Sequence, residues 1–171
     1  GFVSRGLGDV YKRQIIMGSD SDLPIVEASF SILDDFGVKY SKNVMSAHRT
    51  PHDVMELIKD SEKNGCKVFI AAAGMAAHLA GAVAAHSIKP VIGIPIESGG
   101  MGGIDSLLST AMMPPGVPVA TVAVGKSGAK NSAILAVQIL ATNDEDLAVK
   151  LTEYKKNMRS EVLEKDKKLN S

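Results

Sequence analysis

Five short apolar runs, each followed by a segment with helical spacing, are the feature that most constrains the fold of this chain. We expect strands over about 10–17, 38–45, 67–73, 91–96 and 117–124. Short, almost continuously apolar runs are typical of strands covered on both faces, and their alternation with helices is typical of a parallel sheet. The sequence therefore predicts an α/β fold of three layers (αβα), a flavodoxin- or Rossmann-like parallel sheet of about five strands between helices.

The segments between and after the strands carry helix signals. Helices are expected over about 23–36, 51–64, 76–87, 104–112, 127–141 and from 144 toward the end. Gly37 and Gly65 are helix stop signals, and Pro51 fits the first turn of the second helix. Asn143 is expected to cap the last helix, because a short polar side chain there can accept from free backbone N–H groups.

The last helix carries a long apolar stripe among many charged residues. The members of the stripe follow helical spacing: Leu147, Leu151, Tyr154, Met158 and Val162. Two interpretations stay open on this pattern. Either the helix packs on its own domain, or it forms a C-terminal helical arm that docks on a neighbouring subunit.

Composition excludes several classes of protein. The 171 residues suit one domain, placed at 10–171, and 45% hydrophobic residues suffice for a sizeable core. Equal numbers of basic and acidic residues, 19 of each, leave no overall basic field for nucleic acid. No apolar run is long enough to span a bilayer and no secretory signal is recognisable, so we expect no membrane partner and a cytoplasmic location. The single cysteine, Cys66, excludes an intramolecular disulfide and is expected to be a packed thiol.

The first fourteen residues look out of place. They lack an initiator methionine, and the stretch Gly-Leu-Gly-Asp-Val-Tyr-Lys-Arg-Gln resembles read-through of an adapter sequence. We therefore expect residues 1–9 to be non-native or disordered. Val10 and Tyr11 are included in the first predicted strand.

The hexapeptide Ser46-Ala47-His48-Arg49-Thr50-Pro51 places a histidine beside an arginine at the end of a predicted strand. Arginine holds anions with a planar, permanently charged fork, and histidine changes charge near neutral pH. The pair indicates an anionic substrate held beside a proton-transfer group. The structural alternative is a surface loop with a solvated Arg49 and a hydrogen-bonded His48, but the adjacency of Ser46, His48 and Arg49 favours a function.

Two further loops are expected at the same edge of the sheet, beyond the carboxyl ends of the strands, where ligands bind. Gly18-Ser19-Asp20-Ser21-Asp22 offers hydroxyls and free N–H groups for a phosphate, and a carboxylate for ribose hydroxyls. A plain helix cap by Ser21 or Asp22 is an equally open interpretation. The loop 73–81 has little side-chain bulk, which suits either close approach of a ligand or tight helix–sheet packing.

Three other patterns indicate chemistry that the rest of the chain does not support. Val124-Gly125-Lys126-Ser127 resembles the end of a P-loop, but the first glycine of that motif would fall at Ala120, inside an apolar strand. The dinucleotide-binding glycine signature is absent after the first strand, and the glycine-rich segment 99–103 fits a mobile loop over the site. His48 and His52 have the spacing of metal ligands on a helix, but His48 precedes Pro51 and is expected outside the helix, so we expect no metal.

The three loops together resemble one family. The segments 18–22, 46–51 and Ala76-Ala77-His78-Leu79 are similar to motifs of the bacterial 5-(carboxyamino)imidazole ribonucleotide mutases, the class I form of the phosphoribosylaminoimidazole carboxylase family. The similarity continues through Asp105-Ser106-Leu107-Leu108-Ser109, Met113-Pro114-x-Gly116, Pro118-Val119-Ala120-Thr121 and Ala136-x-Gln138-Ile139-Leu140-Ala141, and so covers about 15–164.

This resemblance implies an isomerase of de novo purine (IMP) biosynthesis that needs no metal and no cofactor. Such an enzyme moves a carboxylate from the exocyclic nitrogen to a ring carbon, which yields 4-carboxy-5-aminoimidazole ribonucleotide. The resemblance implies that His48 is the general acid/base of a decarboxylation followed by recarboxylation. Substrate-binding positions of the family are matched by Ser19, Ser21, Ser46 and Arg49 around the phosphate, Asp22 at the ribose, and Ala73, Gly74, Ala77, His78 and Leu79 around the base and carbon dioxide.

The resemblance also implies a homo-octamer with sites at subunit interfaces and a terminal helix that packs on neighbours. Three positions depart from the usual pattern: Met75 stands in place of a glycine, Ala80 of a proline and Met112 of a glutamine.

Two alternatives stay open. One is a class II carboxylase that takes free carbon dioxide and aminoimidazole ribonucleotide. The other is a non-catalytic nucleotide-phosphate binder, which needs Ser19, Asp22 and Arg49 but not His48.

Overall fold

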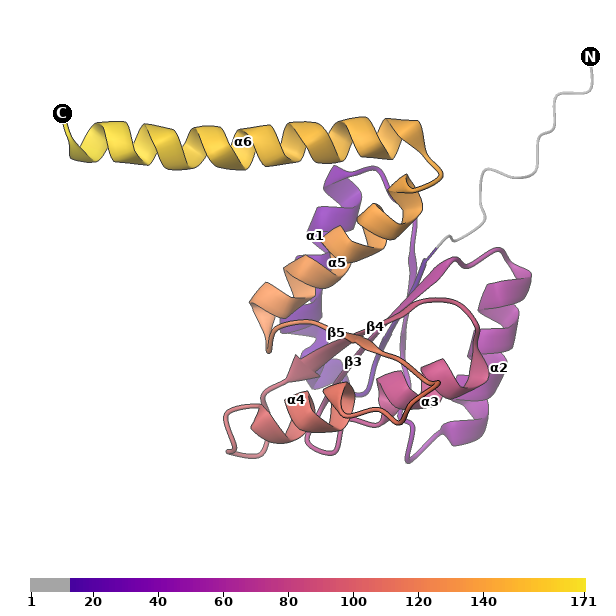
Figure 1. Ribbon diagram of the computed structural model, residues 1–171. Coiled ribbons are helices and arrows are strands. Elements are labelled where there is room, and N and C mark those ends of the chain that lie inside the picture. The colour runs from indigo at the N-terminus through magenta and orange to yellow at the C-terminus, as the bar shows by residue number, and fades with distance from the viewer. Residues whose placement is uncertain (1–12) are drawn as a thin grey trace, which may run out of the picture.

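A computed structural model describes residues 13–171 and contains one parallel sheet in the order β2-β1-β3-β4-β5 (Figure 1). The strands are β1 (Arg13–Met17), β2 (Ser41–Val44), β3 (Val68–Gly74), β4 (Val91–Ile96) and β5 (Ala120–Thr121). The predicted α/β fold with about five parallel strands is confirmed. The predictions for residues 1–9, Val10 and Tyr11 lie outside the described residues.

Helices cover both faces of the sheet, as predicted (Figure 1). One face is covered by α1 (Leu23–Asp35) and α5 (Lys126–Ala141), and the other by α2 (Pro51–Lys63), α3 (Leu79–His86) and α4 (Ile104–Ala111). A 3-10 turn, η1 (Asp20–Asp22), precedes α1, and the long α6 (Glu145–Leu169) ends the chain. The predicted helix start at residue 76 is wrong by about one turn, since α3 starts at Leu79. The chain turns before the helix, where the backbone of Met75 has a positive φ.

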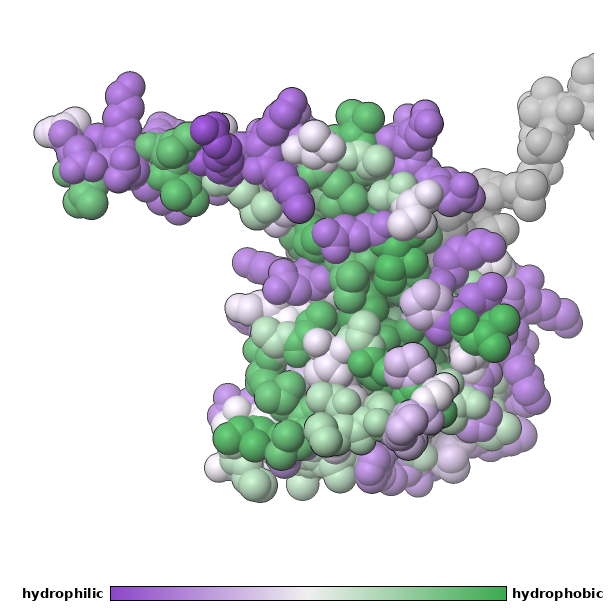
Figure 2. All heavy atoms as spheres, viewed as in Figure 1, coloured by the Kyte–Doolittle hydropathy of each residue, from purple (hydrophilic) through white to green (hydrophobic). Residues whose placement is uncertain are grey.

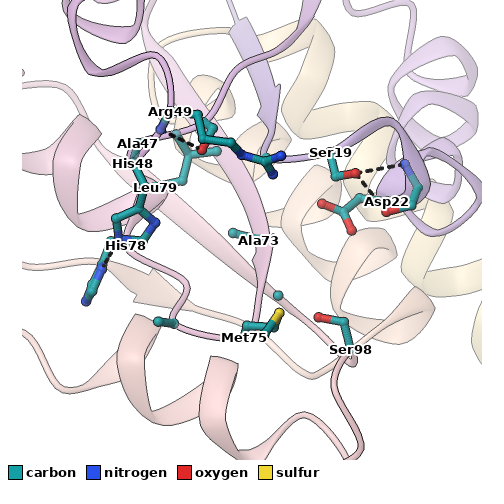
Figure 3. A pocket seen from close by; sticks show the side chains of 15 residues that line it. Ser19, Asp22, Ala47, His48, Arg49, Ala73, Met75, His78, Leu79 and Ser98 are labelled. Carbon is teal, nitrogen blue, oxygen red and sulfur yellow. Dashed lines mark hydrogen bonds between the residues drawn. The ribbon is translucent and has the colours of Figure 1, made fainter.

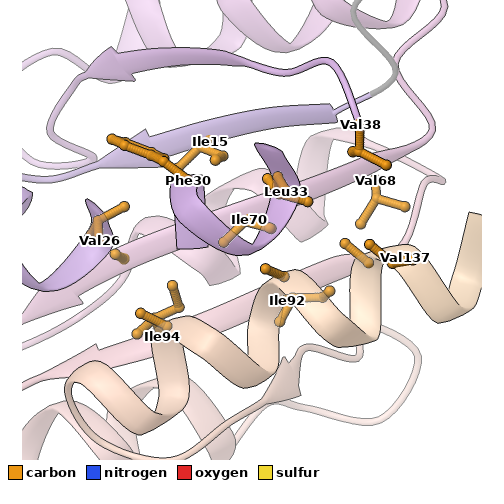
Figure 4. Close-up of a cluster of buried hydrophobic side chains, with 14 of the residues drawn as sticks. Ile15, Val26, Phe30, Leu33, Val38, Val68, Ile70, Ile92, Ile94 and Val137 are labelled. Carbon is orange, nitrogen blue, oxygen red and sulfur yellow. The ribbon is translucent and has the colours of Figure 1, made fainter. Parts of the chain in front are cut away.

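Alternate residues of the central strand β3 face the two helical layers. Val68, Ile70 and Ala72 pack with α1 and α5, whereas Phe69 and Ala71 pack with α2 and α3. Figure 4 shows the first layer, in which Val26, Phe30, Leu33 and Val137 lie over Ile15, Ile70, Ile92 and Ile94. Full burial of each such side chain contributes about 1.5–3 kcal/mol, so the central strands form a firm base for the loops at their ends.

The strand predicted over 117–124 is much shorter than expected, because only Ala120 and Thr121 pair regularly with β4. Proline cannot donate a ladder hydrogen bond, so Pro118 cannot extend the pairing toward Gly116, where φ is +94°. Beyond the strand, Val122 N still donates to Gly93 O at 3.1 Å, so the chain follows β4 without a regular ladder.

The last helix begins as predicted but its cap is the next residue. The Asp144 carboxylate accepts a hydrogen bond from Leu147 N at 3.1 Å, so Asp144 and not Asn143 is the N-cap. The carboxylate supplies two acceptor oxygens and a charge that the positive end of the helix dipole favours.

The two ends of α6 have different surroundings. Leu147 is buried, Leu151 and Tyr154 pack against the core, and the Tyr154 ring lies 5.6 Å from that of Phe36. From Lys155 on, every residue is exposed, and this part of the helix projects beyond the domain (Figure 1). Hydrophobic side chains interrupt its hydrophilic surface (Figure 2). Packing on the chain's own domain is therefore confirmed for the first three members of the apolar stripe. Docking of the projecting part on a neighbouring subunit stays a prediction.

Cys66 is a packed thiol, as predicted. Its Sγ donates to Val68 O at 3.3 Å, and burial raises the pKa of the thiol to about 11. Across residues 13–171, no helix is both long and apolar enough to cross a membrane.

Candidate active site

The loops that follow β1, β2, β3 and β4 meet at the carboxyl edge of the sheet. Since β1 lies between β2 and β3, the chain moves to one side of β1 for β2 and to the other side for β3. Successive loops diverge at such a switch point and leave a crevice there. A cavity of about 440 Å³ occupies this crevice, which is large enough for a nucleotide-sized ligand.

All three loops selected from the sequence line this cavity. The predicted site residues that the structure brings together are Ser19, Ser21, Asp22, Ser46, His48, Arg49, Ala73, Gly74, His78 and Leu79. Ala77 is the exception, because it is buried behind the cavity wall and its N–H donates to Ser109 Oγ at 2.9 Å. Figure 3 shows His48 and His78 on one side of the cavity and Ser19 and Asp22 on the other.

The loop after β1 presents two hydroxyls. Ser19 Oγ accepts a hydrogen bond from Ser21 N at 3.2 Å and lies 2.8 Å from Ser21 Oγ. Ser19 thereby caps η1, whereas Asp22, the N-cap residue of α1, makes no capping hydrogen bond with its side chain. The interpretation of Ser21 or Asp22 as a plain helix cap is therefore wrong, and the side chain of Asp22 is left for another role.

Asp22 is an acidic residue almost withdrawn from solvent, at 6% exposure. Burial raises the pKa of its carboxyl above the ordinary value, and the charge of Asp20 acts in the same direction. A backbone hydrogen bond from Ser19 opposes this rise. Hydroxyl groups of a ligand that donate to this carboxylate would replace the water it has lost.

The loop after β2 is fixed by hydrogen bonds between its ends. Thr50 N and Thr50 Oγ1 donate to Ser46 O at 2.8 and 3.0 Å, and Arg49 N donates to Ser46 Oγ at 3.1 Å. This folded loop leaves the side chains of His48 and Arg49 exposed at the cavity, ahead of the first residue of α2. In Figure 3 the guanidinium of Arg49 extends toward the Ser19 side of the cavity, where it can meet an anion.

His48 and His78 form a pair across the loops. His48 Nε2 lies 2.6 Å from His78 Nδ1, and the two rings meet nearly edge to face, with centroids 4.8 Å apart. One ring nitrogen must carry the hydrogen and the other must accept it, so the pair can relay a proton.

The end of β3 approaches the loop after β4 closely at Gly74. A β-carbon at Gly74 would collide with Ser98 Oγ, which lies just beyond β4. Ser98 also lines the cavity and was missed from the sequence, although the loop after the fourth predicted strand ends at the same edge. Gly18, Ala47, Met75 and Ala76 complete the lining. Across residues 13–171, no three His, Cys, Asp or Glu side chains gather closely enough to hold a metal ion.

Comparison with known proteins identifies the family of this chain. The family model described as AIR carboxylase matches residues 12–161. The chain belongs to the AIR carboxylase family.

Members of the AIR carboxylase family from distant organisms share about half of the residues of this chain. A protein of Thermotoga maritima, named N5-carboxyaminoimidazole ribonucleotide mutase, is 50% identical over 91% of this chain and 90% of its own length. Proteins of the same name from Bacillus subtilis and Escherichia coli are 50% and 45% identical, over 91% and 88% of this chain and 96% and 89% of their own lengths. The crystal structure of Treponema denticola PurE superposes with a TM-score of 0.85 at 31% identity, over 93% of this chain and 98% of that one.

Proposed function

We propose that the chain is an N5-carboxyaminoimidazole ribonucleotide mutase of de novo purine biosynthesis. The observation that carries this proposal is the cavity in which the acid/base pair His48 and His78 faces the ligand-binding groups Ser19, Asp22 and Arg49. Relatives that are half identical over nine-tenths of the chain bear the name of this activity, which supports the choice of substrate.

The charged groups of the cavity suit a ribonucleotide. Arg49 supplies the permanent positive charge for the phosphate, and the hydroxyls of Ser19, Ser21 and Ser46 line the same cavity as hydrogen-bond partners. Asp22, buried and without a capping role, is the acceptor for the ribose hydroxyls. In a protein with no net charge, one exposed arginine in a cavity is a specific anion site and not part of a general basic surface.

His48 performs the proton transfers in this proposal. The bond between the carboxyl carbon and the exocyclic nitrogen breaks, carbon dioxide is released, and His48 gives its proton to the nitrogen, which keeps the electron pair. The ring carbon then bonds to the carbon dioxide and returns its proton to His48. The histidine ends in the state in which it began, so the isomerisation needs no other reactant. His78 orients the His48 ring through the 2.6 Å contact.

The proposed active state is an octamer in the cytoplasm. Two exposed apolar surfaces support assembly. One is the stripe of Ile104 and Leu108 on α4 with Met112 at its C-cap, and the other is the projecting part of α6 with Val162 and Leu163. Figure 2 shows hydrophobic side chains gathered over α4. Exposed apolar side chains that gather on one surface usually mark a site where a partner binds.

Turnover of the purified chain tests the proposed function. N5-carboxyaminoimidazole ribonucleotide is supplied in one reaction, and aminoimidazole ribonucleotide with bicarbonate in another. Conversion of the first substrate at low bicarbonate supports the mutase. Conversion only in the second reaction would assign the chain to the carboxylases that use free carbon dioxide. Binding of both ribonucleotides without any product would show a non-catalytic binder.

A further inference from the structure

A serine hydroxyl without a hydrogen-bond partner lies in the wall of the cavity. Ser98 is half-buried and stands two residues after the end of β4, at the carboxyl edge of the sheet. Its Oγ forms no hydrogen bond with any residue of 13–171. Polar groups that are partly withdrawn from water are normally paired, so this hydroxyl is available to a ligand in the cavity.

The Ser98 side chain lies over Gly74, at the end of β3. A β-carbon on Gly74 would lie 3.1 Å from Ser98 Cβ and would collide with its Oγ, so the serine occupies the space that a side chain at 74 would fill. The end of β4 is anchored as well, because Ser106 Oγ on α4 donates to Ile96 O at 2.8 Å. The hydroxyl is therefore held in a defined place between the ends of two central strands.

The order of the strands relates each part of the cavity to one part of a ribonucleotide. Along the sheet edge, Arg49 follows β2, Ser19 and Asp22 follow β1, Gly74 ends β3 and Ser98 follows β4. Neighbouring strands are about 4.8 Å apart, so these groups succeed one another over roughly 10–15 Å. A phosphate at Arg49 and Ser19 and a ribose at Asp22 leave the end of β3 for the imidazole ring, with Ser98 just beyond it.

The imidazole end of the cavity has the histidine pair on one side and Ser98 on the other. Figure 3 shows Ser98 below Asp22 on one side of the cavity. His48 and His78 lie on the opposite side. A base between them would have its proton-transfer group on one side and a free hydroxyl on the other.

We propose that Ser98 is a substrate-binding residue whose hydroxyl donates a hydrogen bond to the carboxylate that is transferred. The inference rests on the proposed mutase function and adds a contact to it. The carboxylate starts on the exocyclic nitrogen and ends on a nearby ring carbon, and a hydroxyl that rotates about its Cβ–Oγ bond can follow it. Gly74 and Met75, which lie beside Ser98 in the cavity wall, carry no charge that would compete with this anion.

The affinities of Ser98→Ala for three probes test this contact. 4-Carboxy-5-aminoimidazole ribonucleotide carries the carboxylate, aminoimidazole ribonucleotide lacks it, and ribose 5-phosphate lacks the base as well. Calorimetry gives the affinity of wild type and variant for each probe. Ser31→Ala is the matched control, because Ser31 is exposed on α1 and does not line the cavity.

We expect Ser98→Ala to bind the carboxylated ribonucleotide about tenfold more weakly than wild type, because a hydrogen bond to a charged group is lost. Its affinities for the other two probes should stay close to those of wild type, and Ser31→Ala should match wild type with all three. Ser98→Cys, which keeps the shape of the side chain but donates only weakly, should show the same selective loss and decides the question if Ser98→Ala is unstable.

Two results would overturn this inference and leave the mutase function intact. One is an unchanged affinity of both Ser98 variants for the carboxylated ribonucleotide. The other is an equal loss with all three probes, because Ser98 would then only shape the loop or hold the ribose. Wild type that binds neither ribonucleotide would overturn the proposed function and this inference together.

Discussion

His48 Nε2 lies 2.6 Å from His78 Nδ1, and this contact joins the loop after β2 to the N-terminus of α3. A single hydrogen occupies the line between the two nitrogens, so the rings set each other's tautomer. The proposed proton-transfer group is therefore oriented by a second titratable ring, which belongs to a different loop.

His48→Asn should lower kcat by a factor of about 10²–10⁴, because a general acid/base contributes that much and asparagine cannot transfer the proton. Substrate affinity, measured by calorimetry, should change less than about threefold, since Arg49 and Asp22 remain. His52→Asn is the control, because His52 is exposed on α2 and does not line the cavity. The double variant with His78→Asn should be no slower than His48→Asn alone; additive losses would mean that the two rings act separately.

Arg49→Ala should weaken binding of inorganic phosphate and of the ribonucleotide by about 1.5–3 kcal/mol, which is 10- to 150-fold, because a hydrogen bond to a charged group is lost. Lys59→Ala removes a charge from a surface pair with Glu56 and should leave affinity unchanged. Affinity is measured by calorimetry at two salt concentrations. Equal affinities for wild type and Arg49→Ala would exclude Arg49 from the phosphate site.

Asp22→Asn should raise the free energy of unfolding at neutral pH by about 1 kcal/mol while it weakens ribonucleotide binding. The folded-state pKa of Asp22 is raised by burial, so the native chain holds this proton more tightly than the unfolded chain. Wild-type stability therefore falls as the pH rises through that raised pKa, and the advantage of the variant should disappear in acid. Urea unfolding at pH 4 and 7 measures this; a pH-independent difference would contradict the assignment of the burial cost to the carboxylate.

Gly74→Ala should destabilise the fold by about 1–3 kcal/mol, because the added methyl group collides with the Ser98 side chain. Ser98→Gly removes that side chain, so the double variant should recover part of the loss. A thermodynamic cycle from urea unfolding gives the coupling. Purely additive losses would show that the two loops do not meet at this point.

Truncation after Tyr154 should leave the domain folded and dissociate the assembly. The removed residues are all exposed within the chain, so the melting temperature of the monomer should stay nearly constant. Leu147→Ala is the contrast, because it empties a buried position and should cost about 2–5 kcal/mol. Light scattering gives the mass of each variant. An unchanged oligomer after truncation would remove α6 from the interface.

Most of the fold follows from the apolar pattern, and the failures have local causes. The β4 strand over Val91–Ile96 has the predicted limits, because it is continuously apolar and follows Pro90. The last strand was overestimated because Val117, Val119 and Val122 form an apolar run whose pairing Pro118 interrupts. The predicted start of α3 is too early because Ala76 and Ala77 favour helix. In the structure Met75 has a positive φ, and Ser109 on α4 holds the turn that follows through Ala77 N.

Site residues were predictable where the side chain itself can transfer a proton or bind an anion. His48 and Arg49 stand out in any loop, and ten of the eleven predicted site residues line the cavity. Ser98 and Ser109 were not, because serine is common and the contacts of these two depend on how closely two loops and a helix approach. Ala77 was selected by its motif, but its N–H holds the turn in place from behind the cavity wall.

The sheet order β2-β1-β3 couples ligand binding to the stability of the fold. The three principal loops belong to three strands, and they come together only after β1 has paired on both of its edges. A partly folded chain has no cavity, so the ribonucleotide binds the native state alone and adds to its stability, by about 2.7 kcal/mol at a hundredfold excess over Kd. A high cellular concentration of the ribonucleotide would therefore protect the enzyme from unfolding and proteolysis. Depletion of the ribonucleotide would leave the chain more susceptible to both.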